Sequence, residues 1–240
     1  MNAANSMTPA NDAAATSAAV RRRFVQLGAS FLVQAAALFL AAGRLDWPAA
    51  WAYVAMYLGI VAVNAVTILP RSLGLVAERG RMEDTKGWDR ALAVPLGLSG
   101  LATLVVAGLE VRFRWSRPLP SVMQFKGMIL TVLGYGVVSS AMASNRFFSS
   151  LVRIQRDRGH VVATGGPYRI VRHPGYLGMI TASLATPLLL GSRWALLPGG
   201  LTAALYVVRT VLEDRTLQQE LDGYSEYARK VRYRLIPGLW

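Results

Sequence analysis

The sequence predicts an all-α fold: a polytopic transmembrane helix bundle of about six spans, followed by a C-terminal amphipathic helix at the membrane interface. Hydrophobic residues make up 53% of the 240 residues and charged residues only 16%, a composition typical of a membrane protein. Six apolar segments follow one another along the chain, separated by polar stretches. The basic residues gather beside these segments, as they do at the ends of membrane spans.

The composition also excludes several kinds of site. The chain has no Cys, which excludes disulfides, thiolate catalysis and Cys-ligated metals. With two His and 13 acidic residues it offers little material for a metal site, and no metal is expected. The chain has a net charge of +13, and its basic residues lie close to the apolar segments. This placement favours anionic lipid headgroups as partners and argues against nucleic acid.

The first 144 residues divide into a tail and four spans. Residues 1–20 are mostly Ala, Asn, Ser and Thr without apolar periodicity, so we expect a disordered tail. Region 21–144 is expected to hold four transmembrane helices, the first an uncleaved anchor preceded by three Arg. Glu110, at the edge of the third span, is expected to reach water. The predicted spans are 24–42, 49–69, 91–111 and 127–144, with a polar loop at 70–90 and small residues for helix packing in the fourth span, among them Gly127, Gly134 and Gly136.

Region 145–240 is expected to be the catalytic part. An apolar segment of only 14 residues, 177–190, is followed by a turn and a longer apolar segment, 194–212, which together predict a helical hairpin. In the last segment, 213–240, the apolar positions 224, 227, 228 and 231 have helical spacing and alternate with basic residues. This pattern predicts an amphipathic helix at the interface that serves as a membrane anchor or as a lid over a pocket.

The distribution of basic residues predicts the orientation. Twenty of the 26 Lys and Arg residues fall in the N-terminal segment, the 70–90 loop, the 145–173 segment and the C-terminal region. The positive-inside rule therefore places both termini and the catalytic part on the cytoplasmic side of the membrane, here expected to be a bacterial inner membrane.

The stretch GGPYRIVRHPGYLG at 165–178 concentrates the residues with special chemistry. Gly165, Gly166 and Pro167 predict a turn, and a helix should begin at Pro174, because proline favours the first helical turn. The positive end of this helix would face a pocket suited to a carboxylate or phosphate. We expect that pocket to be lined by Tyr168, Arg169, Arg172, His173 and Tyr176.

The hairpin adds two carboxylates to this pocket. A chain that leaves the cytoplasmic side at Pro174 returns there near residue 212, so Glu213 and Asp214 should lie at the depth of His173. Basic, aromatic and acidic groups together suit a ligand of mixed charge, for which S-adenosylmethionine is one candidate. The sequence contains neither a GxGxxG stretch after a strand nor a phosphate-binding Walker loop.

These residues also carry a family resemblance. GPYRIVRHPGYLG at 166–178, the pair Glu213-Asp214, and RYRLIP at 232–237 closely resemble the isoprenylcysteine carboxyl methyltransferase family and its phospholipid methyltransferase relatives. The resemblance covers about the last 95 residues of the chain. It implies a membrane enzyme that takes S-adenosylmethionine from the cytoplasmic side. The acceptor it implies is a lipid or isoprenoid-type molecule from the bilayer, with a carboxylate, amine or thiol head.

The resemblance also implies roles for particular residues. The family usually has Glu-Glu where this chain has Glu213-Asp214, so the second carboxylate is one methylene shorter. The implied catalytic residues are Arg172, His173 and Glu213. The implied cofactor-binding residues are Gly166, Pro167, Tyr168, Arg172, His173, Pro174, Tyr176, Gly178, Glu213 and Asp214. The implied substrate or lid residues are Tyr224, Tyr227, Arg232 and Arg234.

Several alternatives stay open at this point. His173 is expected either to shape the cofactor pocket or to act as a general base, the latter only for an amine or thiol acceptor. Membrane sterol reductases resemble the family in their C-terminal region and bind a nicotinamide cofactor instead. A lipid-binding or transporter-like protein without catalysis is a third possibility. The oligomeric state is not predicted.

Overall fold

The computed structural model of the protein describes residues 9–68 and 85–240 and is helical in both ranges. The predicted all-α class is thereby confirmed. The helices are α1 (Pro9–Ala42), α2 (Pro48–Ile68), α4 (Gly87–Phe113), α5 (Ser121–Ser144), α6 (Pro174–Leu189), α7 (Leu196–Glu220) and α8 (Tyr224–Lys230). Two short 3₁₀ helices, Arg156–Arg158 and Gly166–Arg169, lie in the connection before α6.

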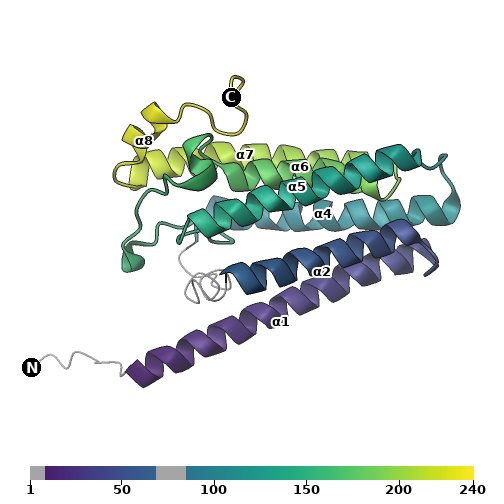
Figure 1. The fold of residues 1–240 in the computed structure, drawn as a ribbon, viewed down its shortest axis with the longest axis horizontal. Helices are drawn as coiled ribbons and strands as arrows, with labels where there is room; N and C mark the ends of the chain where they lie inside the picture. Colours follow the sequence, from purple (N-terminus) through teal and green to yellow (C-terminus); the bar gives the residue numbers. More distant parts are fainter. Residues whose placement is uncertain (1–8, 69–84) are drawn as a thin grey trace, which may run out of the picture.

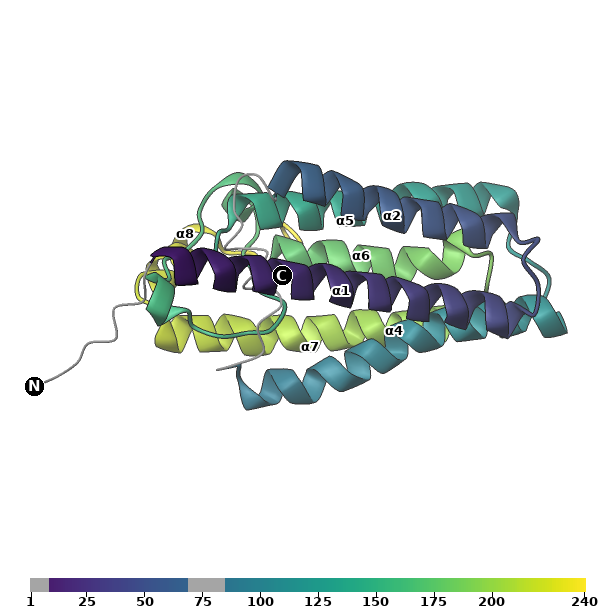
Figure 2. The same cartoon turned by 90° about the horizontal axis from the view of Figure 1, so that it is seen from below.

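Five of these helices, α1, α2, α4, α5 and α7, are long and apolar enough to cross a membrane. The sixth predicted span is α6, which has 16 residues and therefore a length of roughly 24 Å, less than a hydrocarbon core of ~30 Å. Figure 2 shows α6 in the middle of the bundle, between α5 and α7. The chain is a multi-pass membrane protein of about six spans, as predicted.

Successive helices run in opposite directions along the bundle (Figure 1). The short connections 43–47, 114–120 and 190–195 lie at one end, to the right of Figure 1. The opposite end gathers the start of α4, the long connection 145–173, and α8 with the C-terminal segment. The topology therefore brings the basic segments of the chain to the same end.

Small residues allow α5 and α6 to pack with their backbones close together. A Cβ added to Gly134 would lie 2.7 Å from the carbonyl oxygen of Gly178, and one added to Gly178 would lie closer still to the carbonyl oxygen of Gly134. A Cβ on Gly127 would clash with the backbone of Leu189. The packing role predicted for Gly127 and Gly134 is confirmed. Gly136 meets no atom within 4 Å, so its predicted packing role is wrong.

Some predicted boundaries differ from the structure. α1 begins at Pro9, so residues 9–20 of the expected disordered tail are helical, in line with the high helix propensity of their Ala-rich sequence. α4 begins at Gly87, inside the loop predicted for 70–90, while residues 70–84 of that loop lie outside the described residues. The predicted C-terminal helix is short: α7 continues to Glu220, and α8 adds only seven residues.

Glu110 is buried, which corrects the expectation that it reaches water. Its carboxylate accepts hydrogen bonds from the hydroxyls of Ser116 and Ser192 and from the backbone N–H of Trp194, the latter at 3.1 Å. The carboxylate thus holds the turn between α6 and α7 against the end of α4. This turn fixes the hairpin that carries the candidate site at its other end.

Candidate functional site

A cavity of about 230 Å³ lies at the end of the bundle where α6 begins and α7 ends. We call it the end cavity. Its floor comes from the first turns of α6 and from α7, and its roof from the connection 145–163 and from α8. The polar and aromatic side chains that line it include Arg172, His173, Tyr176, Arg209, Glu213, Tyr224 and Tyr227.

The predicted turn and helix start are present at the cavity wall. Gly166–Arg169 forms a 3₁₀ helix, and Pro174 is the first residue of α6, as predicted. Two backbone hydrogen bonds then join the turn to the C-terminal segment. The N–H of Arg172 donates to the carbonyl of Tyr233, and that of His173 to the carbonyl of Arg234, both at 2.9 Å. The RHP and RYR motifs are therefore paired to one another.

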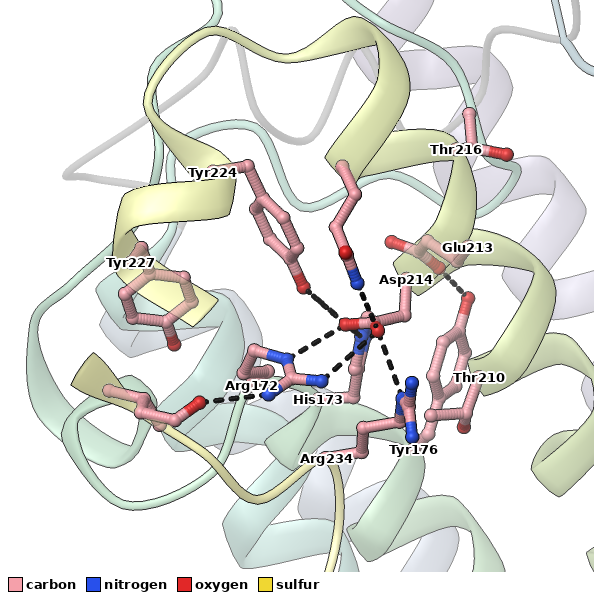
Figure 3. A network of polar contacts seen from close by, with 12 residues as sticks. Arg172, His173, Tyr176, Thr210, Glu213, Asp214, Thr216, Tyr224, Tyr227 and Arg234 are labelled. Atoms are coloured by element: carbon pink, nitrogen blue, oxygen red, sulfur yellow. Dashed lines mark hydrogen bonds and ion pairs between the residues drawn. The ribbon is translucent and has the colours of Figure 1, made fainter. Parts of the chain in front are cut away.

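Asp214 is the centre of the polar network in Figure 3. Its side chain has no exposed surface. Nε of Arg172 lies 2.8 Å from Oδ1, and Nε of Arg234 lies 2.9 Å from Oδ2. The hydroxyl of Tyr224 and the amide of Gln218 donate to the same carboxylate at 2.9 and 2.8 Å. Because these donors occupy the carboxylate oxygens, Asp214 holds the C-terminal segment on the start of α6 instead of facing a ligand.

The hydrogen-bond donors of Arg172 are also bound to groups of the protein. Besides its pair with Asp214, its Nη1 donates to the carbonyl oxygens of Val231 and Arg232 at 2.9 and 2.7 Å. Burial by itself lowers the pKa of Arg172, but the hydrogen bonds and charge of Asp214 outweigh it and raise the pKa, so the guanidinium stays charged. Arg172 is thus fixed at the cavity wall, facing the network.

His173 is held by the same carboxylate. Its Nε2 lies 3.1 Å from Oδ1 of Asp214 and 3.3 Å from the hydroxyl of Tyr224. The predicted juxtaposition of His173 with the carboxylate pair, inferred from the hairpin alone, is confirmed by this contact.

Glu213 is the carboxylate that faces the cavity. It lines the end cavity, whereas its neighbour Asp214 does not. The hydroxyl of Tyr176 donates to Oε2 of Glu213. The ring of Tyr176 is in turn stacked against that of His173, with centroids 5.9 Å apart, and lies under the guanidinium of Arg209 at 5.4 Å. Among the described residues, the cavity is therefore lined by one acidic group, which is set in an aromatic wall.

Tyrosine side chains form the side of the cavity next to α8. Tyr168, Tyr224 and Tyr227 are buried and belong to one apolar cluster. The hydroxyl of Tyr227 donates to the carbonyl of Tyr168 at 2.7 Å. Burial raises the pKa of all three phenols above the ordinary value, so they remain neutral hydrogen-bond donors.

The roof of the cavity is held by residues that sequence reasoning missed. Asp89 of α4 accepts a hydrogen bond from the N–H of Val152 at 2.6 Å, and Nη2 of Arg209 donates to the carbonyl of Ser150 at 2.9 Å. Asp89 and Arg209 also pair with each other. A signal was present in the sequence, because Arg209 lies inside an apolar span, where a charged residue needs a partner.

No cluster of three or more His, Cys, Asp or Glu suited to a metal occurs in the described part of the chain.

The structure sorts the predicted site residues into two groups, those that line the end cavity and those that do not. Gly178 packs against α5, and Arg169 is exposed. The predicted residues that line the end cavity are Tyr168, Arg172, His173, Tyr176, Glu213, Tyr224 and Tyr227. The predicted residues outside its lining are Gly166, Pro167, Arg169, Pro174, Gly178, Asp214, Arg232 and Arg234.

The fold and the cavity define a class of protein: a multi-pass membrane protein with a polar, tyrosine-lined cavity at one end of its helix bundle. Residues 127–219, which include most of α5, all of α6 and most of α7, match the model of the isoprenylcysteine carboxyl methyltransferase (ICMT) family. Through this region the chain is similar to that family, and the resemblance inferred from the motifs is confirmed. The match begins earlier than the motifs do and ends before the RYRLIP segment.

Curated relatives agree with this family. A protein-S-isoprenylcysteine O-methyltransferase of Schizosaccharomyces pombe is 33% identical over 114 residues, which are 46% of this chain and 48% of the relative. A probable protein-S-isoprenylcysteine O-methyltransferase of Oryza sativa subsp. indica is 25% identical over 112 residues, 45% of this chain and 59% of the relative. Protein-S-isoprenylcysteine O-methyltransferase B of Arabidopsis thaliana is 29% identical over 108 residues, 44% and 55% of the two chains.

The matched part thus spans about half the length of these curated relatives. The match to the family model, at 127–219, contains the turn at 165–173 and nearly all of the α6–α7 hairpin, and so the floor of the end cavity. The relatives named here are eukaryotic, and the bacterial inner membrane expected from the sequence stays a prediction.

Proposed function

We propose that the protein is an S-adenosylmethionine-dependent methyltransferase that acts on an apolar acceptor from the bilayer. The observation that carries the proposal is the end cavity. Its one acidic wall residue in the described part of the chain, Glu213, is set among tyrosines at the RHP turn. The named relatives are methyltransferases, and the turn and most of the hairpin lie in the part of the chain that matches the family model.

The residues present fit S-adenosylmethionine. Its ammonium group needs a carboxylate, which Glu213 offers at the cavity wall. Its sulfonium group is favoured by aromatic faces, which Tyr176 and Tyr224 provide. Its carboxylate is favoured by the start of α6, where Gly175 lines the cavity at the positive end of the helix dipole. When bound, the cofactor supplies an electrophilic methyl group.

The protein's own residues then have two tasks. Glu213 and the tyrosines orient the cofactor, and the roof formed by 149–152 excludes water from the reacting atoms. Asp214, Arg172 and His173 act through position: they hold the C-terminal segment that closes the cavity. A carboxylate acceptor needs no base, so this arrangement is sufficient for its methylation.

The acceptor is proposed to enter sideways from the bilayer. α6 is too short to span the hydrocarbon core unaided, and it stands beside longer helices, which leaves room at membrane depth next to the cavity. An apolar tail would remain in lipid while its polar head reached the cavity. Selectivity would then come mainly from the head, because burying the tail gains little relative to lipid.

Cofactor binding is tested by equilibrium titration of the purified protein in detergent with S-adenosylmethionine and, separately, with NADPH. We expect binding of the first alone. Glu213→Gln should weaken it by about 1–3 kcal/mol, the cost of losing a charged hydrogen bond. Glu220→Gln is the matched control, because Glu220 lies on the same helix, outside the cavity, and pairs with Lys86. Equal affinity in wild type and Glu213→Gln would refute the assignment, and binding of NADPH alone would favour the reductase alternative.

The acceptor class is tested with radiolabelled S-adenosylmethionine. The purified protein is supplied with a total membrane-lipid extract, with a prenylcysteine analogue, and with a pool of water-soluble amines and thiols. Label in the lipid extract or the analogue is the expected result and identifies the class of head. Label confined to the water-soluble pool would exclude lateral entry.

The end cavity is further proposed to face the cytoplasm, since the basic segments gather at its end of the bundle. The chain lacks Cys, so single cysteines can be introduced without background. Val161→Cys lies at the cavity end and Arg117→Cys at the other, and both positions are exposed. In intact cells an impermeant thiol reagent should label only the cysteine at 117. Labelling of the cysteine at 161 alone would invert the proposed topology.

A further inference from the structure

The chain does not continue away from the bundle after α8. Its last part, the C-terminal segment of residues 231–240, forms no helix and turns back toward the spanning helices (Figure 1). The turn between α7 and α8 lies farther out from the bundle than this segment does. The C-terminal segment is therefore placed at the end of the spans, where a membrane surface would lie.

Apolar side chains of the C-terminal segment are exposed although they belong to no spanning helix. Leu239 is 76% exposed, Ile236 46% and Tyr233 38%. The turn before α6 adds Ile170, which is 61% exposed. The backbone hydrogen bonds of the RHP motif hold this turn against the segment. An exposed apolar surface of this kind marks a contact with a membrane or a partner.

The same surface is strongly basic. Residues 228–240 contain four basic residues and no acidic one. Two of the four are paired with carboxylates, Lys230 with Glu226 and Arg234 with Asp214. The exposed arginines of this surface that have no carboxylate partner among the described residues are Arg169, Arg229 and Arg232.

An anionic membrane surface suits both features at once. Guanidinium groups bind lipid phosphates through charged hydrogen bonds, and the apolar side chains between them enter the boundary between headgroups and acyl chains. A free phosphate ion would pair with the arginines but would leave the apolar side chains in water. α8 by itself offers less to a membrane, because its aromatic residues Tyr224 and Tyr227 are buried at the end cavity.

We propose that this surface, the docking face, binds anionic lipid headgroups and that its docking holds the RHP turn in place. The coupling is direct, because the N–H groups of Arg172 and His173 donate to carbonyls of the C-terminal segment, and Nη1 of Arg172 donates to two more. The proposal concerns binding to lipid and needs neither a cofactor nor methyl transfer. The residues of the docking face are Arg169, Ile170, Arg229, Arg232, Ile236 and Leu239.

The first measurement is the depth of the C-terminal segment in a membrane. The purified protein with Leu239→Cys carries a fluorescent dye on this cysteine, which is its only one. It is placed in nanodiscs of phosphatidylcholine alone or mixed with phosphatidylglycerol, with the same share of brominated acyl chains in both. The bromine atoms should quench the dye more strongly in the anionic discs. A dye at Asp222→Cys, in the exposed turn between α7 and α8, should be quenched equally in both.

The second measurement is amide hydrogen exchange of the RHP turn in the same two kinds of disc, without the dye. The amides of residues 170–173 should exchange more slowly in the anionic discs, because docking makes the opening of this turn less frequent. The double variant Arg229→Gln with Arg232→Gln should lose most of the lipid dependence in both measurements. The matched control, Arg117→Gln with Arg193→Gln, changes two exposed arginines at the other end of the bundle and should behave as wild type.

Two results would overturn the docking face. One is quenching of the dye at position 239 that is no stronger in the anionic discs, whether it is strong or absent in both. The other is an undiminished preference for the anionic discs in the Arg229 and Arg232 double variant. Exchange of the RHP turn that is independent of lipid charge would overturn the coupling.

Discussion

Asp89 of α4 and Arg209 of α7 form a buried, two-pronged ion pair, with Nε to Oδ1 at 2.7 Å and Nη2 to Oδ2 at 2.8 Å. Asp89 lies outside the family match at 127–219, whereas Arg209 lies within it. The pair therefore ties the N-terminal helices to the cavity, and it also holds the roof through Ser150 and Val152.

Removing one member of this pair should be costly. We expect Asp89→Ala to lower the free energy of unfolding by about 3–5 kcal/mol, because it leaves the buried guanidinium of Arg209 without its negatively charged partner. The double variant with Arg209→Met should lose less than the sum of the single losses. Denaturant unfolding in detergent measures both. The control is Asp46→Asn, which breaks the exposed ion pair with Arg44 and should change the free energy of unfolding little. A loss as large as that of Asp89→Ala would show that burial of the Asp89–Arg209 pair is not the cause of its effect.

Asp214→Asn keeps the size of the side chain and removes the charge that Arg172 and Arg234 share. We expect a loss of about 3–5 kcal/mol in unfolding free energy. The C-terminal segment should also become accessible to protease, because Asp214 joins it to α6. Asp222→Asn, at an exposed position close by, is the matched control. An intact C-terminal segment in Asp214→Asn would show that the backbone pairing alone holds it.

The contact between α5 and α6 predicts opposite effects for two glycines. Gly178→Ala should destabilise the protein by about 1–3 kcal/mol, because the added methyl group meets the backbone of Gly134. Gly136→Ala should stabilise it by up to about 1 kcal/mol, since the methyl group meets no atom within 4 Å and Ala is the better helix former. Thermal unfolding of the two variants side by side is the measurement. Equal effects of the two substitutions on the unfolding midpoint would mean that α5 and α6 can move apart without loss of stability.

His160 predicts a pH dependence. Burial, together with the charges of Arg153 and Arg158, lowers its pKa from 6.5 to about 4. Its Nδ1 accepts the N–H of Gln155, which requires the unprotonated ring nitrogen. Between pH 6.5 and 4 the unfolded chain binds a proton that the folded chain does not, so the stability of the fold should fall as the pH is lowered through this window.

Above pH 6.5 the ring is neutral in both states and contributes no pH dependence. The measurement is the unfolding midpoint against pH for wild type and His160→Gln, whose amide oxygen can accept the same hydrogen bond. The variant should lose part of the acid sensitivity. Parallel curves for the two proteins would assign that sensitivity to other groups.

Local patterns predicted much of this protein. Apolar length alone identifies the spanning helices, because a helix in hydrocarbon must satisfy its own backbone. Pro174 marks the start of α6, since proline is favoured in the first turn and disfavoured further in. The hairpin then requires that Asp214 return to the depth of His173, and the structure has the two in contact.

The partners of the buried charges depend on tertiary packing. Asp89 and Arg209 are 120 positions apart, and Glu110 and Ser192 are 82 apart. Charge and burial predict that each needs a partner, but only the packing of α4 against α7 and the hairpin turn selects which one.

The roles of Glu213 and Asp214 illustrate this division most clearly. They are adjacent carboxylates, and the sequence places both at the site. Successive residues of a helix point about 100° apart, so only one of them can face the cavity. The rotation of α7 is set by its packing against α4 and α6, which turns Asp214 toward Arg172 and Arg234 and leaves Glu213 at the cavity wall.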